Sequence, residues 1–576
     1  MQDIKNNTAI DLRIDNAQIA DVFSGTFFHG SVCVHKGIIV GFSEDMYAKK
    51  VLDAEKAYLL PAFFDAHVHI ESSMLCPEKF AELVIPFGTG TVIADPHEIA
   101  NVKGTDGIRY MLESARQSLL DVKIMLPSCV PALPFECSGA NLSALDLAEL
   151  ITEENVLGLG EMMNVPGVLM QDESVLEKLE LAYKNGRIID GHAPQVHGKD
   201  LDMYVLSGVS TDHECTTAEE AAERIRRGMY VLLREGSAAH DLVNLLPAVN
   251  SHTIQNCLFC TDDKQCIDIM RRGHINNSVS LAIEHGIAPI DAVRMATINT
   301  ARAYGIRHKG AIAPGMEASF MLVKDMKKCM PHAVYIQGRL AAENGKYIAA
   351  GSKKYNAKLE QLTDNMQDSM HAELPKVLTL HIPSKKARVI RLLPHSLLTA
   401  CEIADIAVDA DGNFDFSRNK GMLKLAVVER HKKTGKFGLG LLHGEYGLKN
   451  GAIATSISHD SHNIVAAGDN DEDLRIALEE IEKMGGGIAM ISQGKILTKL
   501  ALPIGGLMSM QEPEIVATAL KHLYNLAKDH YQIWDKADAF MSLSFLALPV
   551  IPDLKLTPQG LFDVTTFQFV SLDAEE

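Results

Sequence analysis

The chain has 576 residues, of which 47% are hydrophobic and 22% charged, and its formal net charge is −19. This composition is typical of globular proteins and excludes general disorder, while the length favours about three domains rather than one core. The acidic charge disfavours nucleic acid as a partner, because it repels the phosphate backbone, and its simplest interpretation is solubility.

The N-terminal residues, MQDIKNNTAIDLRID, lack the basic segment and the apolar run of a signal peptide. No apolar run reaches the roughly 18 residues that a membrane span requires, so no membrane partner is expected. Ten cysteines are scattered along the chain without an even framework. In a chain without an export signal they predict free thiols in a reducing, cytoplasmic environment.

Five segments follow one another along the chain. Residues 1–60 contain short strand-like runs with Gly-rich turns, which predict the first part of a small β-sandwich domain. Residues 61–305 alternate apolar runs with amphipathic helical stretches such as GIRYMLESARQSLL and AEEAAERIRRG. Repeated strand-then-helix units predict a parallel sheet, and about eight units predict a closed (β/α)8 barrel of the TIM type.

The chain then returns to strands over residues 306–350, which we expect to complete the N-terminal sheet as the second part of the β-sandwich. Residues 351–375 are polar and suit a linker. Residues 376–576 predict a C-terminal α/β domain. Its clearest element is DEDLRIALEEIEKMGGG, in which acidic residues begin a helix and glycines end it. The expected fold class is therefore α/β throughout.

Polar residues that can carry chemistry follow the apolar runs of the barrel region, where each predicted strand ends. Barrel enzymes build their active sites at this end of the strands. The pattern as a whole is more informative than any of its members, which are His67, His97, Ser128, Glu161, His192, His213, Arg234 and Asp262.

The segment PAFFDAHVHIESS contains His67 and His69 two residues apart. On a strand this spacing points both imidazoles to the same face, here the barrel mouth, where they can bind one cation. An H-x-H pair alone is a weak signal, because two histidines at an exposed strand end give the same pattern. Asp65 and Pro61 strengthen it, since the arrangement resembles the amidohydrolase superfamily signature.

Further candidates end the later strands. Glu161 follows VLGLG, and a carboxylate can bridge two cations through its two oxygens. His192 in RIIDGHAP and His213 in GVSTDHE fit a second cation. NCLFCTDD ends in Asp262 and Asp263, of which one can bind a cation and accept a proton while the other contacts the substrate. Each of these residues alone is more simply a loop carboxylate, a structural histidine or a turn.

Together these side chains offer four imidazoles and two carboxylates, enough for two divalent cations. The donors include no thiolate and suit manganese or iron, with zinc also compatible. Two cations lower the pKa of a shared water toward neutrality, which predicts hydrolysis with Asp262, Asp263 and Glu161 as catalytic residues. The predicted metal ligands are His67, His69, Glu161, His192, His213 and Asp262.

A zinc site of the cytidine deaminase kind is the competing interpretation, because H-x-E begins at His69 and C-x-x-C joins Cys257 to Cys260. Asn256 rather than proline precedes Cys257, and the two halves lie far apart in the chain. We therefore expect these cysteines to pack in a buried strand.

Several segments, in their order and spacing, resemble the bacterial and archaeal adenine deaminase family of the amidohydrolase superfamily. The C-terminal run SISHDSHNIVAAGDNDED also resembles the C-terminal domain of that family, so the resemblance covers nearly the whole chain. The segments in the first half are HIESSM, DPHEIANV, SCVPA, EMMNVPG, DGHAP, REGSA, CTDD and GHI.

The resemblance implies conversion of adenine to hypoxanthine and ammonia in purine salvage, with a purine base as the small-molecule partner. It makes Glu161 the bridge, His67, His69 and Asp262 the ligands of one cation, and His192 and His213 those of the other. Asp263 would hydrogen-bond the purine. Pocket residues without assigned individual roles are His97, Glu98, Arg234 and Ser237. We also expect a homo-oligomer, a dimer or larger.

Two departures from the family pattern are visible. Ala62 stands where the superfamily commonly has glycine, and Gln195-Val196-His197 replaces a smaller turn, which puts the loop shape in doubt rather than metal binding.

Three questions stay open at this point. The segment Ser458-His459-Asp460-Ser461-His462-Asn463 is more simply a hydrogen-bonded loop than a further metal site. The substrate is alternatively another cyclic amide or aminated heterocycle. A non-catalytic, amidohydrolase-like assembly protein is disfavoured, because all six predicted ligands are present and the site rather than the fold decides function.

Overall fold

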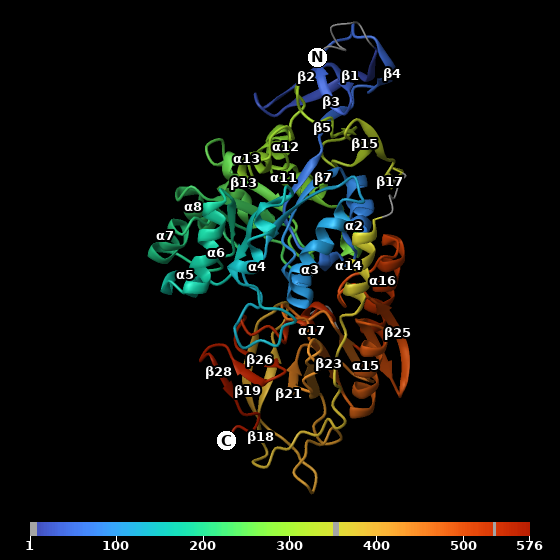
Figure 1. Ribbon diagram of the computed structural model, residues 1–576. Helices are drawn as coiled ribbons and strands as arrows, with labels where there is room; N and C mark the ends of the chain where they lie inside the picture. The colour runs from blue at the N-terminus through green and yellow to red at the C-terminus, as the bar shows by residue number, and fades with distance from the viewer. Residues whose placement is uncertain (1–8, 350–355, 534–536, 576) are drawn as a thin grey trace.

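The computed structural model describes residues 9–349, 356–533 and 537–575. Figure 1 shows the N-terminal strands at one end of the molecule, the C-terminal strands and helices at the other, and the helix-flanked parallel strands between them. Among the described residues, no helix has both the length and the apolar character needed to cross a membrane.

Segments from both sides of the central region build one nine-stranded sheet. Strand β5 (Tyr58–Pro61) pairs antiparallel with β14 (Phe320–Val323), with Leu60 opposite Met321, so the prediction that the later segment completes the N-terminal sheet is confirmed. The other strands are β1 (Ile10–Asp21), β2 (Thr26–His35), β3 (Ile38–Gly41), β4 (Ala48–Asp53), β15 (Pro331–Ile336), β16 (Arg339–Glu343) and β17 (Lys346–Tyr347).

Eight parallel strands occupy the central region, in the apolar runs predicted from the sequence. Five form one sheet, namely β6 (Phe63–Val68), β7 (Thr89–Ala94), β8 (Asp121–Leu126), β9 (Val156–Met162) and β10 (Ile188–Gly191). Three form a second sheet, namely β11 (Thr211–Asp212), β12 (Tyr230–Arg234) and β13 (Cys257–Cys260). Most of their residues are buried, which explains why these strands read as largely apolar runs.

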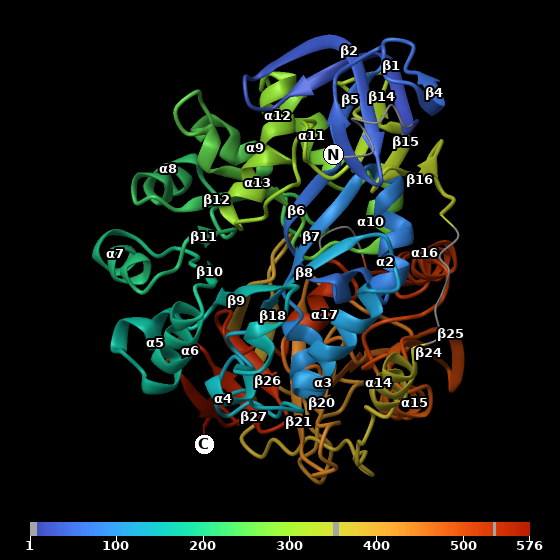
Figure 2. The ribbon, with the colours of Figure 1, turned by 45° about the horizontal axis from the view of Figure 1, so that its top comes forward.

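Backbone hydrogen bonds link the two parallel sheets at both of their edges. Ser210 N donates to Ile189 O over 3.0 Å beside β10 and β11, and Asp262 N donates to His67 O over 2.9 Å where β13 meets β6. The strands thereby curve around one another, as Figure 2 shows, and the carboxyl ends of β6 and β13 lie together.

Helices flank these strands. The helix predicted over residues 107–120 begins earlier, as part of α3 (His97–Ala115), which bends at Gly104, where φ is 57° and glycine is favoured. The predicted helix after Thr217 is confirmed as α8 (Ala218–Arg226), capped by that threonine and Glu220. The others used below are α2 (Pro77–Val84), α5 (Val165–Met170), α6 (Glu173–Lys184), α7 (Gly198–Leu206) and α10 (Cys266–Arg272).

The C-terminal region holds an eight-stranded, mostly antiparallel sheet in the order β19-β18-β21-β20-β23-β22-β24-β25. Helix α15 (Asp471–Lys483) packs on it, is capped by Asn470 and is followed by glycines at 485–487, as predicted. The strands are β18 (Lys386–Leu392), β19 (Thr399–Asp405), β20 (Leu423–Val428), β21 (Phe437–Gly444), β22 (Ala452–Thr455), β23 (Ile464–Gly468), β24 (Gly487–Ser492) and β25 (Lys495–Ala501).

Part of the predicted linker is helical. Residues 351–355 lie outside the described residues, but α14 (Ala357–Gln367) follows directly and packs against α3. Leu362 and Met366, four residues apart, bury the apolar side of this helix, and Asn356 caps its first turn.

The C-terminal region contacts the central strands and their helices directly. Helix α16 (Pro513–Asp529) packs against α10 and α2, with Tyr524 Oη donating to Gln265 Oε1 over 3.0 Å. Residues 458–463, which we call the 458–463 loop, join β22 to β23 and touch the segment that follows β8, where Asn463 Nδ2 donates to Cys137 O over 2.9 Å. The C-terminal region thus reaches the end of the parallel strands that carries the candidate site.

A buried ion pair beside this end offers a test of the packing. Arg224 is fully buried, donates to Asp212 Oδ2 over 2.9 Å and to Ala193 O over 2.7 Å, and so ties the ends of β10 and β11 together. We expect Arg224→Met to destabilise the protein by about 3 kcal/mol or more, because Asp212 is left buried and unpaired.

Urea unfolding monitored by circular dichroism measures this change. The control is Arg227→Met, which removes a more exposed pair with Asp202 and should cost under about 1 kcal/mol. Equal unfolding midpoints for the two variants would contradict the assigned role of Arg224.

Candidate metal centre

The six predicted metal ligands converge at the carboxyl ends of the parallel strands. His67 lies near the end of β6 and His69 directly follows this strand, with their Nε2 atoms 3.2 Å apart. Asp262 Oδ1 lies 3.5 Å from His67 Nε2 and 3.1 Å from His69 Nε2. Glu161 Oε1 lies 3.3 Å from His69 Nε2, so four donors from three strands face a common point.

The second oxygen of Glu161 faces the other two histidines. Glu161 Oε2 lies 2.7 Å from His192 Nδ1 and 3.3 Å from His213 Nε2. One carboxylate therefore stands between two groups of donors, as a bridging ligand does.

The spacing of these atoms fits a pair of divalent cations. Within each of the His/Asp/Glu triads found here, the donor atoms lie within 4.8 Å of one another. Bonds of about 2.0–2.2 Å from nitrogen or oxygen to a cation bring donors to such separations. Among these triads are His67-His69-Glu161, His67-His213-Asp262 and Glu161-His192-His213.

Asp95 holds two of the proposed ligands, His69 and Glu161, in position through hydrogen bonds. Its backbone oxygen accepts from His69 Nδ1 over 2.9 Å, which turns the other ring nitrogen toward the cluster, and its Oδ2 accepts from Glu161 N over 2.9 Å. Position 160, directly before Glu161, requires glycine, because a Cβ on Gly160 would stand 2.1 Å from Asp95 Oδ2. The sequence analysis quoted Asp95 in DPHEIANV without giving it a role.

Charges in the cluster depend on one another. Burial raises the pKa of Glu161, but hydrogen bonds from His192 and His213 outweigh burial and hold it well below its usual range. Burial and the nearby His213 lower the pKa of His67 to about 3, so this imidazole is neutral and able to bind a cation. Burial opposes charge on His213, yet its hydrogen bond to Glu161 raises its pKa to about 9. Cations and protons compete for these donors, so metal affinity falls as pH falls.

Arg234 lies beside the cluster and is enclosed by carboxylates. Its Nη1 lies 3.0 Å from Asp262 Oδ2 and also contacts Glu214, while its Nη2 lies 3.0 Å from Asp241 Oδ2. Glu214 was not singled out from the sequence, although it directly follows His213 and its Oε1 lies 3.4 Å from His213 Nε2. The guanidinium thus orients Asp262 rather than standing free.

Asp263 and Ser237 lie next to each other but face differently. Ser72 Oγ donates to Asp263 Oδ1, and Ser237 N donates to Asp263 O over 2.8 Å. The hydroxyl of Ser237 instead donates to Asp268 Oδ2 over 2.6 Å and accepts from Gln265 N over 2.9 Å. The structure therefore brings the Asp263 side chain to the cluster and directs the Ser237 hydroxyl toward α10.

His97 and Glu98, the other two predicted pocket residues, begin α3 beside the cluster. His97 Nδ1 lies 3.3 Å from Glu161 Oε1, and His97 Nε2 lies 3.4 Å from Glu98 Oε1. Glu98 in turn contacts His459 and His462 of the 458–463 loop. No local pattern in the sequence signals this contact, because it joins regions far apart in the chain.

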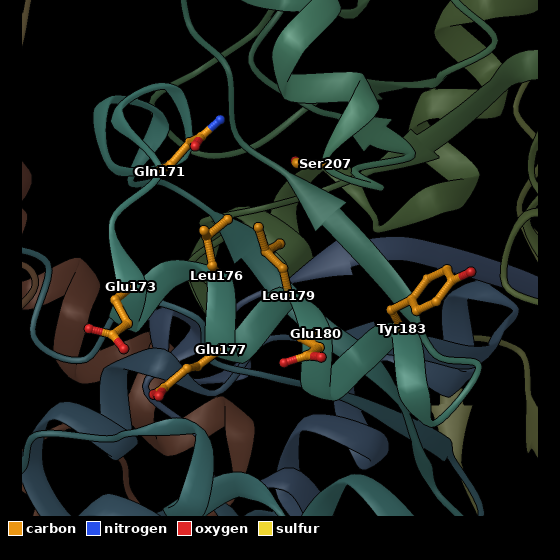
Figure 3. Close-up of a pocket in the computed structure, with 8 residues that line it drawn as sticks. All are labelled: Gln171, Glu173, Leu176, Glu177, Leu179, Glu180, Tyr183 and Ser207. Atoms are coloured by element: carbon orange, nitrogen blue, oxygen red, sulfur yellow. The ribbon is translucent and has the colours of Figure 1, made fainter.

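A surface hollow of about 670 Å³ lies elsewhere, along α6 (Figure 3). Exposed side chains such as Tyr183 and Leu176 form part of its wall, together with glutamates that point to solvent. None of its lining residues belongs to the metal centre, so this hollow is not a candidate for the catalytic site.

Comparison with known proteins agrees with this geometry. The amidohydrolase family model matches residues 58–341, and the model for the adenine deaminase C-terminal domain matches residues 396–568. A relative named adenine deaminase from Nitratidesulfovibrio vulgaris (strain DP4) is 48% identical over 569 residues, which cover 98% of this chain and 96% of the relative. The chain belongs to the adenine deaminase family.

Two further family members are similar over nearly the same length. The adenine deaminase of Geobacillus kaustophilus (strain HTA426) is 45% identical, with 98% of this chain and 97% of the relative covered. Adenine deaminase 2 of Carboxydothermus hydrogenoformans is 46% identical, with 97% and 96% covered. The family resemblance stated from the sequence is thereby confirmed.

Removal of one imidazole tests the metal centre. We expect His67→Ala to bind at least one divalent cation fewer than wild type, because a donor shared by two of the triads is lost while the fold persists. Inductively coupled plasma mass spectrometry of the purified protein measures the metal content.

His240→Ala is the matched control, because His240 belongs to none of the triads named above and bonds Glu235 at the surface. It should retain the wild-type metal content. Full metal content in His67→Ala would remove this residue from the centre.

Proposed function

We propose that the chain hydrolyses adenine to hypoxanthine and ammonia at a centre of two divalent cations, manganese or iron in preference to zinc. The observation that carries the proposal is the convergence of six buried or nearly buried side chains, in which Glu161 stands among the other five. Full-length relatives named adenine deaminase support the choice of substrate. The proposal includes a role in purine salvage, a cytoplasmic location and a homo-oligomeric state.

The proposed architecture has three parts. The two parallel sheets, hydrogen-bonded to each other at β10–β11 and β13–β6, are proposed to form one closed (β/α)8 barrel over residues 61–305. Residues 1–60 and 306–350 are proposed to form the small β-sandwich domain. Residues 351–375 are proposed to connect this domain to the C-terminal α/β domain, residues 376–576.

The reaction adds water at C6 of the purine and releases the 6-amino group, so a proton must pass from water to the departing nitrogen. When bound, the cations lower the pKa of that water. Asp262 accepts the proton and returns it to the leaving group, held in place by Arg234 on its other oxygen. Asp263, oriented by Ser72, hydrogen-bonds the purine, and Glu161 holds the two groups of histidines together.

The remaining predicted pocket residues receive different roles. His97, whose ring contacts Glu161 and Glu98, is proposed to line the purine site. Arg234 acts through Asp262, and Ser237 acts through the backbone of Asp263. Direct contact of Glu98, Arg234 and Ser237 with the purine stays a prediction.

Asp263 offers a test of substrate contact. We expect Asp263→Asn to lower kcat/KM for adenine by about 100-fold or more, because the charged hydrogen bond to the purine ring is lost. Metal content should match wild type, since Asp263 is not among the six proposed ligands. Asp291→Asn is the control, because the partly exposed Asp291 carboxylate pairs with Arg294, and it should leave kcat/KM unchanged.

The substrate itself is tested by ammonia release from adenine, adenosine, guanine and cytosine, each with manganese-loaded protein. Turnover of adenine above the other three is expected. Turnover of another compound without adenine would favour the alternative, an amidohydrolase for a different ring, while leaving the metal centre intact.

A further inference from the structure

A second cluster of metal-binding side chains lies beside the proposed centre. It consists of Glu98 at the start of α3 with His459 and His462 of the 458–463 loop, and the donor atoms of the three lie within 4.8 Å of one another. All three residues are buried, with exposed fractions of 2%, 5% and 1%. A buried Glu-His-His set has the composition of a cation site rather than of a solvated surface loop.

Within this cluster, an imidazole nitrogen faces each carboxylate oxygen of Glu98. His459 Nδ1 lies 2.8 Å from Glu98 Oε1. Glu98 Oε2 and His462 Nε2 are in direct contact. A buried carboxylate needs opposite charge or donors around it, and a cation held by these three side chains would balance the charge of Glu98.

We propose that Glu98, His459 and His462 bind a third divalent cation. Two imidazole nitrogens and one carboxylate oxygen suit the same metals as the proposed pair, namely manganese, iron or zinc. A cavity of about 10 Å³, lined in part by Ser458, His459 and Ser461, adjoins the site and has room for about one water molecule as a further ligand.

The third site is distinct from the proposed pair. None of its three ligands is among the six proposed ligands of the pair. The ring of His97 stands between the two sites, with Nδ1 3.3 Å from Glu161 Oε1 and Nε2 3.4 Å from Glu98 Oε1. A cation here would tie the C-terminal region to the first turn of α3 and hold that turn against the centre. Glu98 would then act as a metal ligand rather than as a purine contact.

The first experiment counts cations. Metal-free full-length protein is loaded with Mn²⁺, passed through a desalting column and measured for manganese per chain. Wild type should hold three, and the double variant His459→Gln/His462→Gln should hold two. The control is His530→Gln in the same region, where the imidazole bonds Ser492 Oγ, and this variant should hold three.

Each outcome of this count is decisive. A wild-type count of two, or three cations in the double variant, overturns the third site and leaves the proposed pair standing. A single cation that the double variant loses supports the third site and contradicts the pair.

The second experiment needs no variant and so avoids any effect of substitution on folding. Crystals of the Mn²⁺-loaded wild-type protein are measured at a wavelength where manganese scatters anomalously. We expect a peak bonded to Glu98, His459 and His462, separate from those around Glu161. A map with peaks around Glu161 and none at Glu98 would overturn the proposal.

Discussion

One buried carboxylate constrains the rest of the candidate site. Glu161 is 3% exposed, and a charge removed from water is tolerated only when opposite charge or hydrogen-bond donors surround it. Imidazoles at the ends of three other strands meet this requirement. His69 faces Oε1 of Glu161, and His192 and His213 face its Oε2. The same constraint explains the positions of Asp95 and Gly160, since the Asp95 carboxylate accepts from the backbone of Glu161 and Gly160 leaves room for that carboxylate.

The parallel strands satisfy this constraint because their carboxyl ends meet. Hydrogen bonds between the end of β13 and β6 bring Asp262 to His67, although these residues are nearly 200 positions apart in the numbering. Arg224 and Asp212 play the corresponding structural role for β10 and β11. The 458–463 loop then covers the neighbouring first turn of α3, so a segment from the C-terminal region lies against a site that the central strands build.

Much of this arrangement was predictable from the sequence, for a physical reason. An apolar run that ends in a histidine or a carboxylate indicates both a buried strand and the polar residue at the end of that strand. The strand positions and the helix after Asn470 were confirmed. The polar composition of residues 351–375 concealed α14, because its two buried residues, Leu362 and Met366, are a weak apolar signal. Residue types also did not distinguish Glu214 from an ordinary acidic loop residue.

Other parts of the site depend on contacts that no local pattern carries. Glu98 meets His459 and His462 only through the docking of the C-terminal region. The direction of the Ser237 hydroxyl, toward Asp268 rather than toward the cluster, is set by the start of α10. Such features follow from tertiary packing and require coordinates.

The measurement that tests the central claim most directly is the affinity of Glu161→Gln for Mn²⁺, compared with wild type under buffered free metal. Glutamine keeps the shape of the side chain and removes its charge and one acceptor oxygen. The account predicts that cations at the Glu161 centre bind at least about tenfold more weakly, in line with the loss of about 1.4 kcal/mol or more of ligand interaction. Unchanged occupancy and affinity at every site would contradict it.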